Sequence, residues 1–243
     1  MTTETRPSVG RGLRLSSLGL IAYSFLACSI IGLAWTNLRV ANPGEAPLSD
    51  LTVAVLFEVL SWACLPIFAW LFVAEFTARG GSWRFGGALL AAAVVAEVPF
   101  DLVASGRAVD VSAQNPLWAF VFCFLGAKLF GYVDSRGGQA GLLKAVIAVG
   151  VALWLVLLQV GVRFGLVYLG LFIFAFFLVF WFLRARENTM MLTAGLLGAS
   201  MLIAPALGVI ALHYRAPMLD KDARLHWGFL WLYPALLLIA ALV

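Results

Sequence analysis

Ionisable side chains inside long apolar stretches are the residues of this sequence that could do chemistry. They are Glu58, Glu75, Glu97, Asp101 and Lys128. A charged group near the middle of a bilayer costs about 2.5–3.5 kcal/mol on insertion scales, so such groups usually face a polar interior and act there. We therefore expect the function of this chain to depend on these five residues.

Two of these acids are predicted to share a catalytic site. At a rise of about 1.5 Å per residue, Glu58 and Glu97 both fall about 10 Å below the same membrane surface. Glu58 lies in a stretch that runs inward from Leu51, and Glu97 lies in the next stretch, which runs outward to Val103. Either carboxylate could act as a general base.

Asp101 extends this acidic site by one helical turn. Glu97 and Asp101 are four residues apart and share a helix face, and Pro99 between them should kink or end the helix. Gln114 and Asn115 begin the next stretch at the same level, which makes them candidate substrate-binding residues. The alternative for this group is a hydrogen-bonded corner that only holds the two helices together.

The remaining candidates are a structural ion pair and two possible ligand-binding side chains. Glu75 and Lys128 lie near the inner ends of their stretches, where an ion pair is expected rather than chemistry. Tyr233 should lie about 10 Å below the outer surface and line a pocket. His226, at the outer interface, is a candidate for substrate binding or an interfacial anchor. No histidine or cysteine spacing indicates a metal site.

The composition identifies the elements that must position these residues. Hydrophobic residues make up 63% of the chain, charged residues 12%, and the mean hydropathy is +1.02. A soluble domain of this size could not bury so much apolar surface, so we predict an all-α polytopic membrane bundle. A spanning helix needs about 20 apolar residues. About eight stretches qualify: Leu18–Trp35, Leu51–Phe76, Phe85–Val103, Pro116–Val133, Leu142–Val162, Gly165–Leu183, Met190–His213 and Trp227–Val243.

The organisation is predicted to be a polar cytoplasmic tail, residues 1–15, and a single transmembrane domain, residues 16–243. Arginine and lysine are somewhat more frequent in the loops on the side of the N-terminus, which favours a cytoplasmic N-terminus. An even number of spans would place both termini on that side. The net charge of +4 follows from this bias and indicates no nucleic-acid partner. Pro66 predicts a kink in the second span.

Four segments in order resemble the TraX family of bacterial membrane proteins, whose namesake acetylates the N-terminus of conjugative pilin. They are Pro66–Phe76, Ala96–Leu102 with its Glu-x-Pro-Phe-Asp core, Gln114–Asn115 and Leu232–Pro234. The resemblance covers roughly residues 13–133 and the last helix. It implies a multi-pass protein of the bacterial inner membrane that transfers an acetyl group to an amine.

The chain departs from this family at the residues expected to be most reactive. The family's Asp-His pair in the first helix corresponds to Ser24–Phe25, and the histidine after Tyr-Pro corresponds to Leu236. The arginine before Pro-Ile-Phe is Trp62, and an aspartate at the start of the sixth helix is Arg163. An active enzyme would therefore need Glu97 or Glu58 as its base.

Three functions remain open at this point. The first is an acyltransferase that uses acetyl-CoA or another cytosolic acyl-CoA and modifies a membrane or envelope acceptor such as a pilin-like protein. Its oxyanion donors would be Asn115, Gln114 or Tyr233. The second is a non-catalytic scaffold or accessory subunit of an envelope complex, which the missing histidines favour. The third is a small transporter. Basic residues of the inner loops could bind the phosphates of CoA: Arg79, Arg84, Arg136, Lys144, Arg184 and Arg186.

Overall fold

The computed structural model describes residues 12–40, 45–137, 140–163, 165–216 and 228–242. Apart from one short antiparallel hairpin, β1 (Val162–Arg163) with β2 (Val167–Tyr168), the named elements of this part are helices, which confirms the all-α prediction. The helices are α1 (Leu15–Arg39), α2 (Leu48–Ser61), α3 (Cys64–Ala78), α4 (Trp83–Ser105), α5 (Leu117–Arg136), α6 (Ala140–Leu157), α7 (Leu169–Leu183), α8 (Glu187–Ala199), α9 (Ala204–His213) and α10 (Gly228–Ala241).

Five segments of the described chain are long and apolar enough to cross a membrane. They are Leu15–Thr36, Leu48–Ala78, Trp83–Ser105, Leu117–Arg136 and Ala140–Leu157, and they match the first five predicted spans in position. The last three predicted spans correspond to shorter helices. By length and composition, therefore, the predicted number of about eight is not reached.

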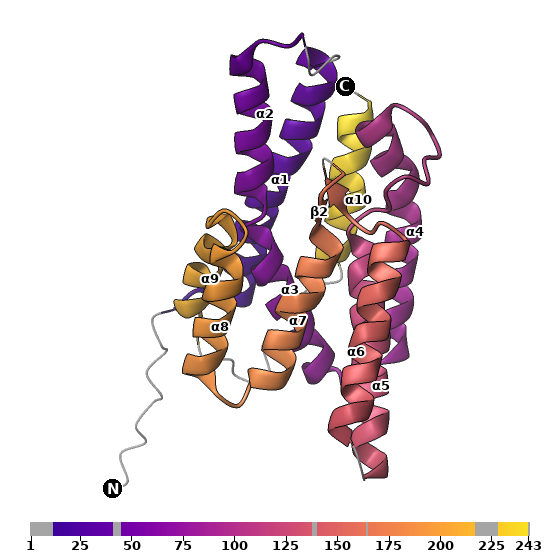
Figure 1. Ribbon diagram of the computed structural model, residues 1–243, viewed down its shortest axis with the longest axis vertical. Coiled ribbons are helices and arrows are strands. Elements are labelled where there is room, and N and C mark those ends of the chain that lie inside the picture. The colour runs from indigo at the N-terminus through magenta and orange to yellow at the C-terminus, as the bar shows by residue number, and fades with distance from the viewer. Residues whose placement is uncertain (1–11, 41–44, 138–139, 164, 217–227, 243) are drawn as a thin grey trace, which may run out of the picture.

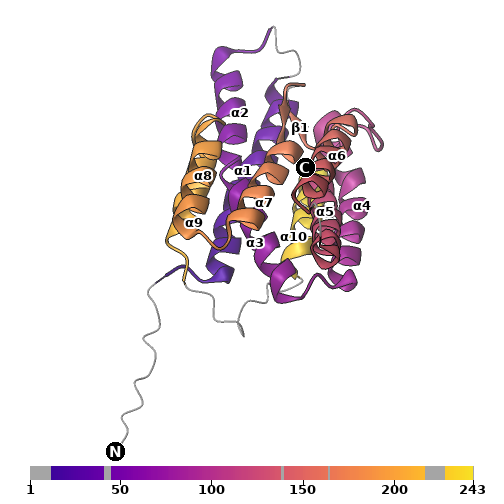
Figure 2. The ribbon, with the colours of Figure 1, turned by 60° about the horizontal axis from the view of Figure 1, so that its bottom comes forward.

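The helices run along the longest axis of the molecule, and two ends can be defined (Figure 1). At the lower end α1 begins and α3 and α5 end; at the upper end α4 ends and the β-hairpin lies (Figures 1 and 2). The central helix is α3, which contacts α1, α5, α7 and α9. It is apolar on all sides because it is buried on nearly all sides.

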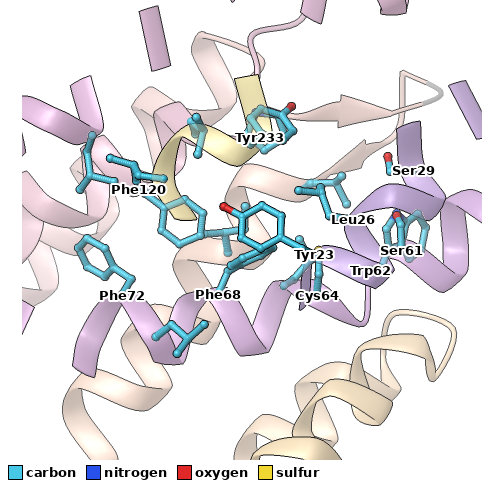
Figure 3. A pocket seen from close by; sticks show the side chains of 18 of the residues that line it. Tyr23, Leu26, Ser29, Ser61, Trp62, Cys64, Phe68, Phe72, Phe120 and Tyr233 are labelled. Atoms are coloured by element: carbon cyan, nitrogen blue, oxygen red, sulfur yellow. The ribbon is translucent and has the colours of Figure 1, made fainter. Parts of the chain in front are cut away.

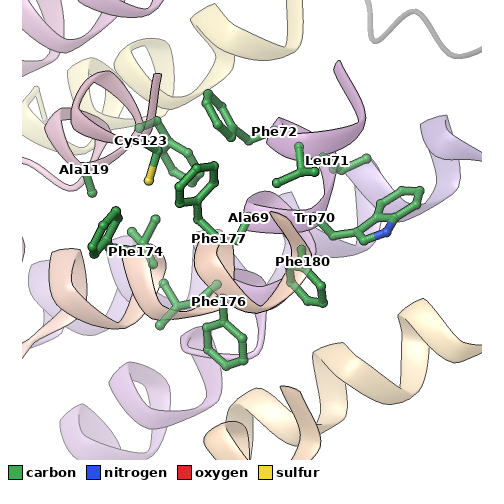
Figure 4. Packing of buried hydrophobic residues seen from close by; sticks show 14 of the residues in the cluster. Ala69, Trp70, Leu71, Phe72, Ala119, Cys123, Phe174, Phe176, Phe177 and Phe180 are labelled. Atoms are coloured by element: carbon green, nitrogen blue, oxygen red, sulfur yellow. The ribbon is translucent and has the colours of Figure 1, made fainter. Parts of the chain in front are cut away.

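Aromatic side chains fill the core between α3, α5 and α7. Phe72 of α3 meets Phe177 of α7 edge to face, with ring centroids 5.7 Å apart. Phe176, Phe177 and Phe180 of α7 are fully buried in the same cluster (Figure 4). The phenylalanine-rich sequence of α7 is thus core, and α3 is held rigidly along its length.

The second span is continuous in sequence but broken in structure between α2 and α3, at Trp62 and Ala63. Pro66 lies in the first turn of α3, where its missing N–H needs no helical acceptor. The kink predicted from Pro66 is therefore present, just before the proline itself. The break gives Glu58, at the end of α2, its position beside α1.

The predicted span Met190–His213 is wrong, because the chain turns back within it. Residues 200–203 separate α8 from α9, and the two helices pack against each other (Figure 1). A Cβ atom on Gly198 would lie 2.8 Å from the Ala206 nitrogen, so the two backbones approach closely. Arg215, just after α9, donates two hydrogen bonds of 2.7 Å to Glu187 at the start of α8.

Both ends of this hairpin therefore lie at the lower end of the bundle. Leu13 exchanges backbone hydrogen bonds of 2.8 and 2.9 Å with Tyr214 and Ala216, which holds the end of the hairpin beside the start of α1. α10 then runs to the upper end (Figure 1). Among the described residues α1 therefore begins at the lower end and α10 finishes at the upper end, whereas the prediction expected both termini on one side. Arg215 belongs to the lower end, not to the upper one.

Gly208 provides a test of how the hairpin is seated. It packs on the break between α2 and α3, where an added Cβ would lie 2.8 Å from Pro66 Cγ and closer still to the Ala63 carbonyl oxygen. Gly208→Ala should lower the free energy of unfolding by about 1–3 kcal/mol, because the tight contact must open. Gly195→Ala is the matched control in α8: nothing lies within 4 Å of its added Cβ. In denaturant titration in detergent micelles, the free energy of unfolding of the Gly195→Ala protein should be unchanged or higher by up to about 1 kcal/mol.

Candidate functional site

A buried ion pair in the upper half of the bundle connects β1 to α2. Arg163 of β1 donates a hydrogen bond of 3.1 Å from Nε to Glu58 Oε1, and the two side chains are only 9% and 5% exposed. The indole N–H of Trp62 donates to the same oxygen at 3.2 Å, and the Ser29 hydroxyl donates to Oε2 at 3.1 Å. A buried carboxylate needs such partners, because an uncompensated charge in an apolar interior is costly.

Arg163 is the site residue that the sequence analysis missed. It was treated as a loop residue between two spans, yet its guanidinium carbon lies 5.3 Å from the centre of the Phe100 ring, inside the bundle. Within the described part of the chain, its two terminal amino groups have no hydrogen-bond partner. The signal in the sequence was a single arginine between two apolar stretches, with no acidic residue close to it in the sequence.

Asp101 is buried, and one of its oxygens is unpaired. Oδ2 accepts a hydrogen bond of 2.8 Å from the Asp110 backbone N–H, which ties the following loop to the end of α4. Oδ1 is buried without a partner among the described residues. Asp110 itself accepts from the Ser112 N–H at 2.9 Å, and this hydrogen bond holds the pKa of the Asp110 carboxyl below its usual range. Asp101 is therefore the acid of this site with one oxygen that has no partner among the described residues.

Glu97 and Asn115 form the hydrogen-bonded corner that was the alternative to a catalytic role. Glu97 accepts hydrogen bonds from the Trp118 indole at 2.7 Å and from the Asn115 side-chain amide. Asn115 is fully buried; its amide also donates to the Ala93 carbonyl at 2.9 Å, and its oxygen accepts from the Leu117 N–H at 3.0 Å. The corner fixes the start of α5 against α4.

Glu97 and Glu58, which were predicted to share a site, therefore do not line a common cavity. Glu58 lines the polar cavity described below together with Asp101, whereas Glu97 lines neither cavity. Equal depth did not bring Glu97 and Glu58 together, because the Asn115 corner directs Glu97 toward α5.

The other predicted binding residues divide into three cases. Gln114 acts through its backbone, which donates to the Gln159 carbonyl at 3.2 Å and accepts from Gly161 at 2.7 Å. Tyr233 of α10 is buried and lines a cavity, as predicted. His226 lies outside the described residues.

The predicted ion pair of Glu75 with Lys128 is replaced by two other contacts. Glu75 binds Arg79, one turn further along the same helix. The Lys128 ammonium lies 5.1 Å from the centre of the Trp83 ring, a cation–π arrangement. The i,i+4 spacing of Glu75 and Arg79 explains the choice, since side chains four apart on a helix are neighbours.

Two cavities meet at this site. A polar cavity of about 430 Å³ opens at the upper end, and its lining includes Glu58, Asp101, Asp110 and Arg163. An apolar cavity of about 140 Å³ begins beside Ser61, at the end of α2, and follows α3 from Cys64 to Arg79 (Figure 3). Leu33 and Arg163 line both, and we call these two residues the junction.

The walls of the apolar cavity come mainly from α1, α3, α4, α5, α7 and α10. Figure 3 shows Tyr23, Phe68, Phe72 and Phe120 around it, with Tyr233 from α10. The Tyr23 and Phe68 rings are 5.0 Å apart and meet edge to face. Among the described residues no group of three or more histidine, cysteine or acidic side chains could hold a metal ion.

Comparison with protein-family models, with curated proteins and with solved structures finds no match. The resemblance to the TraX family therefore stays a prediction, and the case for a function depends on the geometry of the two cavities.

Proposed function

We propose that this protein is a membrane acyltransferase whose chemistry takes place where the two cavities meet. The observation that carries the proposal is the junction itself: a buried guanidinium with free donors lies between an apolar channel and an acidic cavity. Acyl transfer needs a donor and an acceptor to meet in this way, beside a base and a group that stabilises the oxyanion.

The residues at the junction suit these roles. Asp101, whose side chain lines the polar cavity, would take the proton from the attacking amine or hydroxyl and return it to the leaving group. The terminal amino groups of Arg163 would donate to the oxyanion as the new bond to the acyl carbon forms and the bond to the leaving group breaks. Glu58 would position Arg163 through its hydrogen bond to Nε.

The location and the substrates belong to the same proposal. Basic residues gather at the lower end, including Arg79, Arg136 and Arg215, which supports a cytoplasmic lower end. The bacterial inner membrane is the location that the TraX resemblance implies. An acyl-CoA would then approach from below. The acidic upper cavity suits a cationic acceptor, such as an amine on a membrane or envelope protein.

Asp101→Asn tests this assignment. It removes the base while a similar shape remains, so acyl transfer in proteoliposomes should fall about 100-fold. Glu97→Gln is the matched control, because Glu97 is four residues away on the same helix and lines neither cavity. It should keep nearly full turnover. Equal loss of activity in the two variants would contradict the assignment.

A non-catalytic scaffold is the second candidate. It is favoured by Glu97 and Glu58, whose carboxylates are both satisfied by neighbouring side chains. Mass spectrometry of envelope proteins and lipids from cells with and without the chain separates the two: an acyl-sized mass difference supports the enzyme, and its absence supports the scaffold. The apolar lining of the channel does not favour a transporter of polar solutes.

A further inference from the structure

The apolar cavity has the dimensions of an extended chain. It follows α3 from Cys64 to Arg79, which at about 1.5 Å per residue is about 22 Å. One leaflet of membrane hydrocarbon is about 15 Å thick, half of the ~30 Å core. With a volume of about 140 Å³ over that length, the cavity is narrow. Its length and its apolar lining match one extended hydrocarbon chain.

The side chains that line the apolar cavity favour a hydrocarbon chain over a polar ligand such as the pantetheine arm of CoA. The charged residues of the lining stand at the two ends: Arg163 at the upper one, and the Glu75–Arg79 pair at the lower one. Between them the walls are mostly aliphatic and aromatic, as at Phe68 and Phe120. The amides of a pantetheine arm would lose their water there with few partners in return. A methylene group instead gains about 0.8 kcal/mol on burial.

The charges at the upper end indicate which part of the ligand lies there. Glu58 and Asp101 line the polar cavity together with Arg163, so a free carboxylate bound directly at Arg163 would be repelled. An ester carbonyl is neutral and still accepts hydrogen bonds from the free amino groups of Arg163. At the lower end Arg79 is already bound to Glu75. The reacting end of the chain is therefore expected at the junction, with the chain directed downward.

We propose that the apolar cavity binds one long-chain fatty acyl group of a membrane lipid, with its ester carbonyl at Arg163 and its methyl end near Leu71 and Phe72. A lipid in the upper leaflet has this direction already, because its ester lies near the surface and its chain points to the midplane. The assignment rests on the proposed function for its role as acyl donor, in which the lipid ester takes the place of the acyl-CoA. Binding itself can be measured without turnover.

The test uses the full-length protein in vesicles that contain a phospholipid with a photoactivatable diazirine at the end of a palmitoyl chain. After illumination, peptide mass spectrometry should find label at Leu71 or Phe72, in addition to lipid-facing residues such as Val146 and Val149 on α6. Label at Ile30, Leu33 or Ser61 instead would mean the reverse orientation and would overturn the proposal. Label on the lipid-facing residues alone would also overturn it.

Two tryptophan variants make the result specific. Leu117→Trp narrows the cavity and should reduce the label at Leu71 and Phe72 at least fivefold. Leu143→Trp, on the exposed face of α6, is the matched control and should leave it unchanged. In a correctly folded Leu117→Trp protein the label on α6 persists. If that label is lost, the experiment uses Leu26→Trp instead of Leu117→Trp, because Leu26 narrows the same cavity from α1.

A final set of measurements distinguishes a phospholipid from an acyl-CoA as the source of the acyl chain, and distinguishes failure of this inference from failure of the proposed function. The same diazirine chain presented as palmitoyl-CoA should label Leu71 and Phe72 less than the phospholipid does; the opposite order would overturn the lipid source. Asp101→Asn should label like the wild type, because binding precedes proton transfer. Labelling without any transfer would contradict the proposed function alone, and transfer without labelling would contradict this inference alone.

Discussion

Arg163→Met should lower the free energy of unfolding by about 3–5 kcal/mol, the usual cost of leaving one member of a buried ion pair without its partner. Glu58 would keep its hydrogen bonds from Ser29 and Trp62 but lose the only opposite charge beside it among the described residues. Methionine has a similar length, so the loss reflects charge rather than a cavity. Denaturant titration in detergent micelles measures it.

A second variant distinguishes loss of charge from loss of packing. In the double variant Glu58→Gln with Arg163→Met the buried charge is gone, while the glutamine oxygen still accepts from Trp62. Most of the lost stability should return, since a neutral replacement of a buried ion pair is often tolerated. Arg107→Met, an exposed arginine at the same end, should change stability by less than about 0.5 kcal/mol. If the double variant were no better than Arg163→Met, the pair would not be the cause.

Asn115→Leu should lower the free energy of unfolding by a similar amount, about 3–5 kcal/mol, through a different mechanism. Leucine removes the hydrogen bonds to Glu97, to the Ala93 carbonyl and from the Leu117 N–H at once. Each buried polar group left unpaired costs about 1–3 kcal/mol, and a charged one costs more. Both the unfolding free energy and the hydrogen-exchange protection of the first turn of α5 should fall.

Gln114→Leu provides the neighbouring comparison. The hydrogen bonds of Gln114 to Gln159 and Gly161 come from its backbone, so the substitution leaves them in place. Its unfolding free energy should stay within about 0.5 kcal/mol of the wild type. Equal losses at positions 114 and 115 would show that the corner is generally sensitive and that the Asn115 side chain has no special role.

Where the sequence predictions failed, the reason lies in contacts between distant segments. Apolar composition cannot separate a helix that crosses the membrane from a pair that turns back, because both are surrounded by hydrocarbon. The α8–α9 hairpin was therefore predicted as one span, although the close approach at Gly198 and the pairing of Arg215 with Glu187 hold its two helices together. Depth estimates likewise placed Glu97 at the level of Glu58 without indicating the direction of its side chain.

The sequence by itself determined the helical class of the fold, the positions of the five long apolar segments, and that Glu58, Asp101 and Tyr233 would line internal space, because these follow from composition, length and the cost of a charge in hydrocarbon. Only the tertiary structure decided which charges meet. Glu58 and Arg163 are 105 residues apart, and no local pattern encodes a contact over that distance. The partner of a buried charge is chosen by how whole helices pack, and here that packing placed Arg163 in the walls of both the apolar cavity and the acidic cavity.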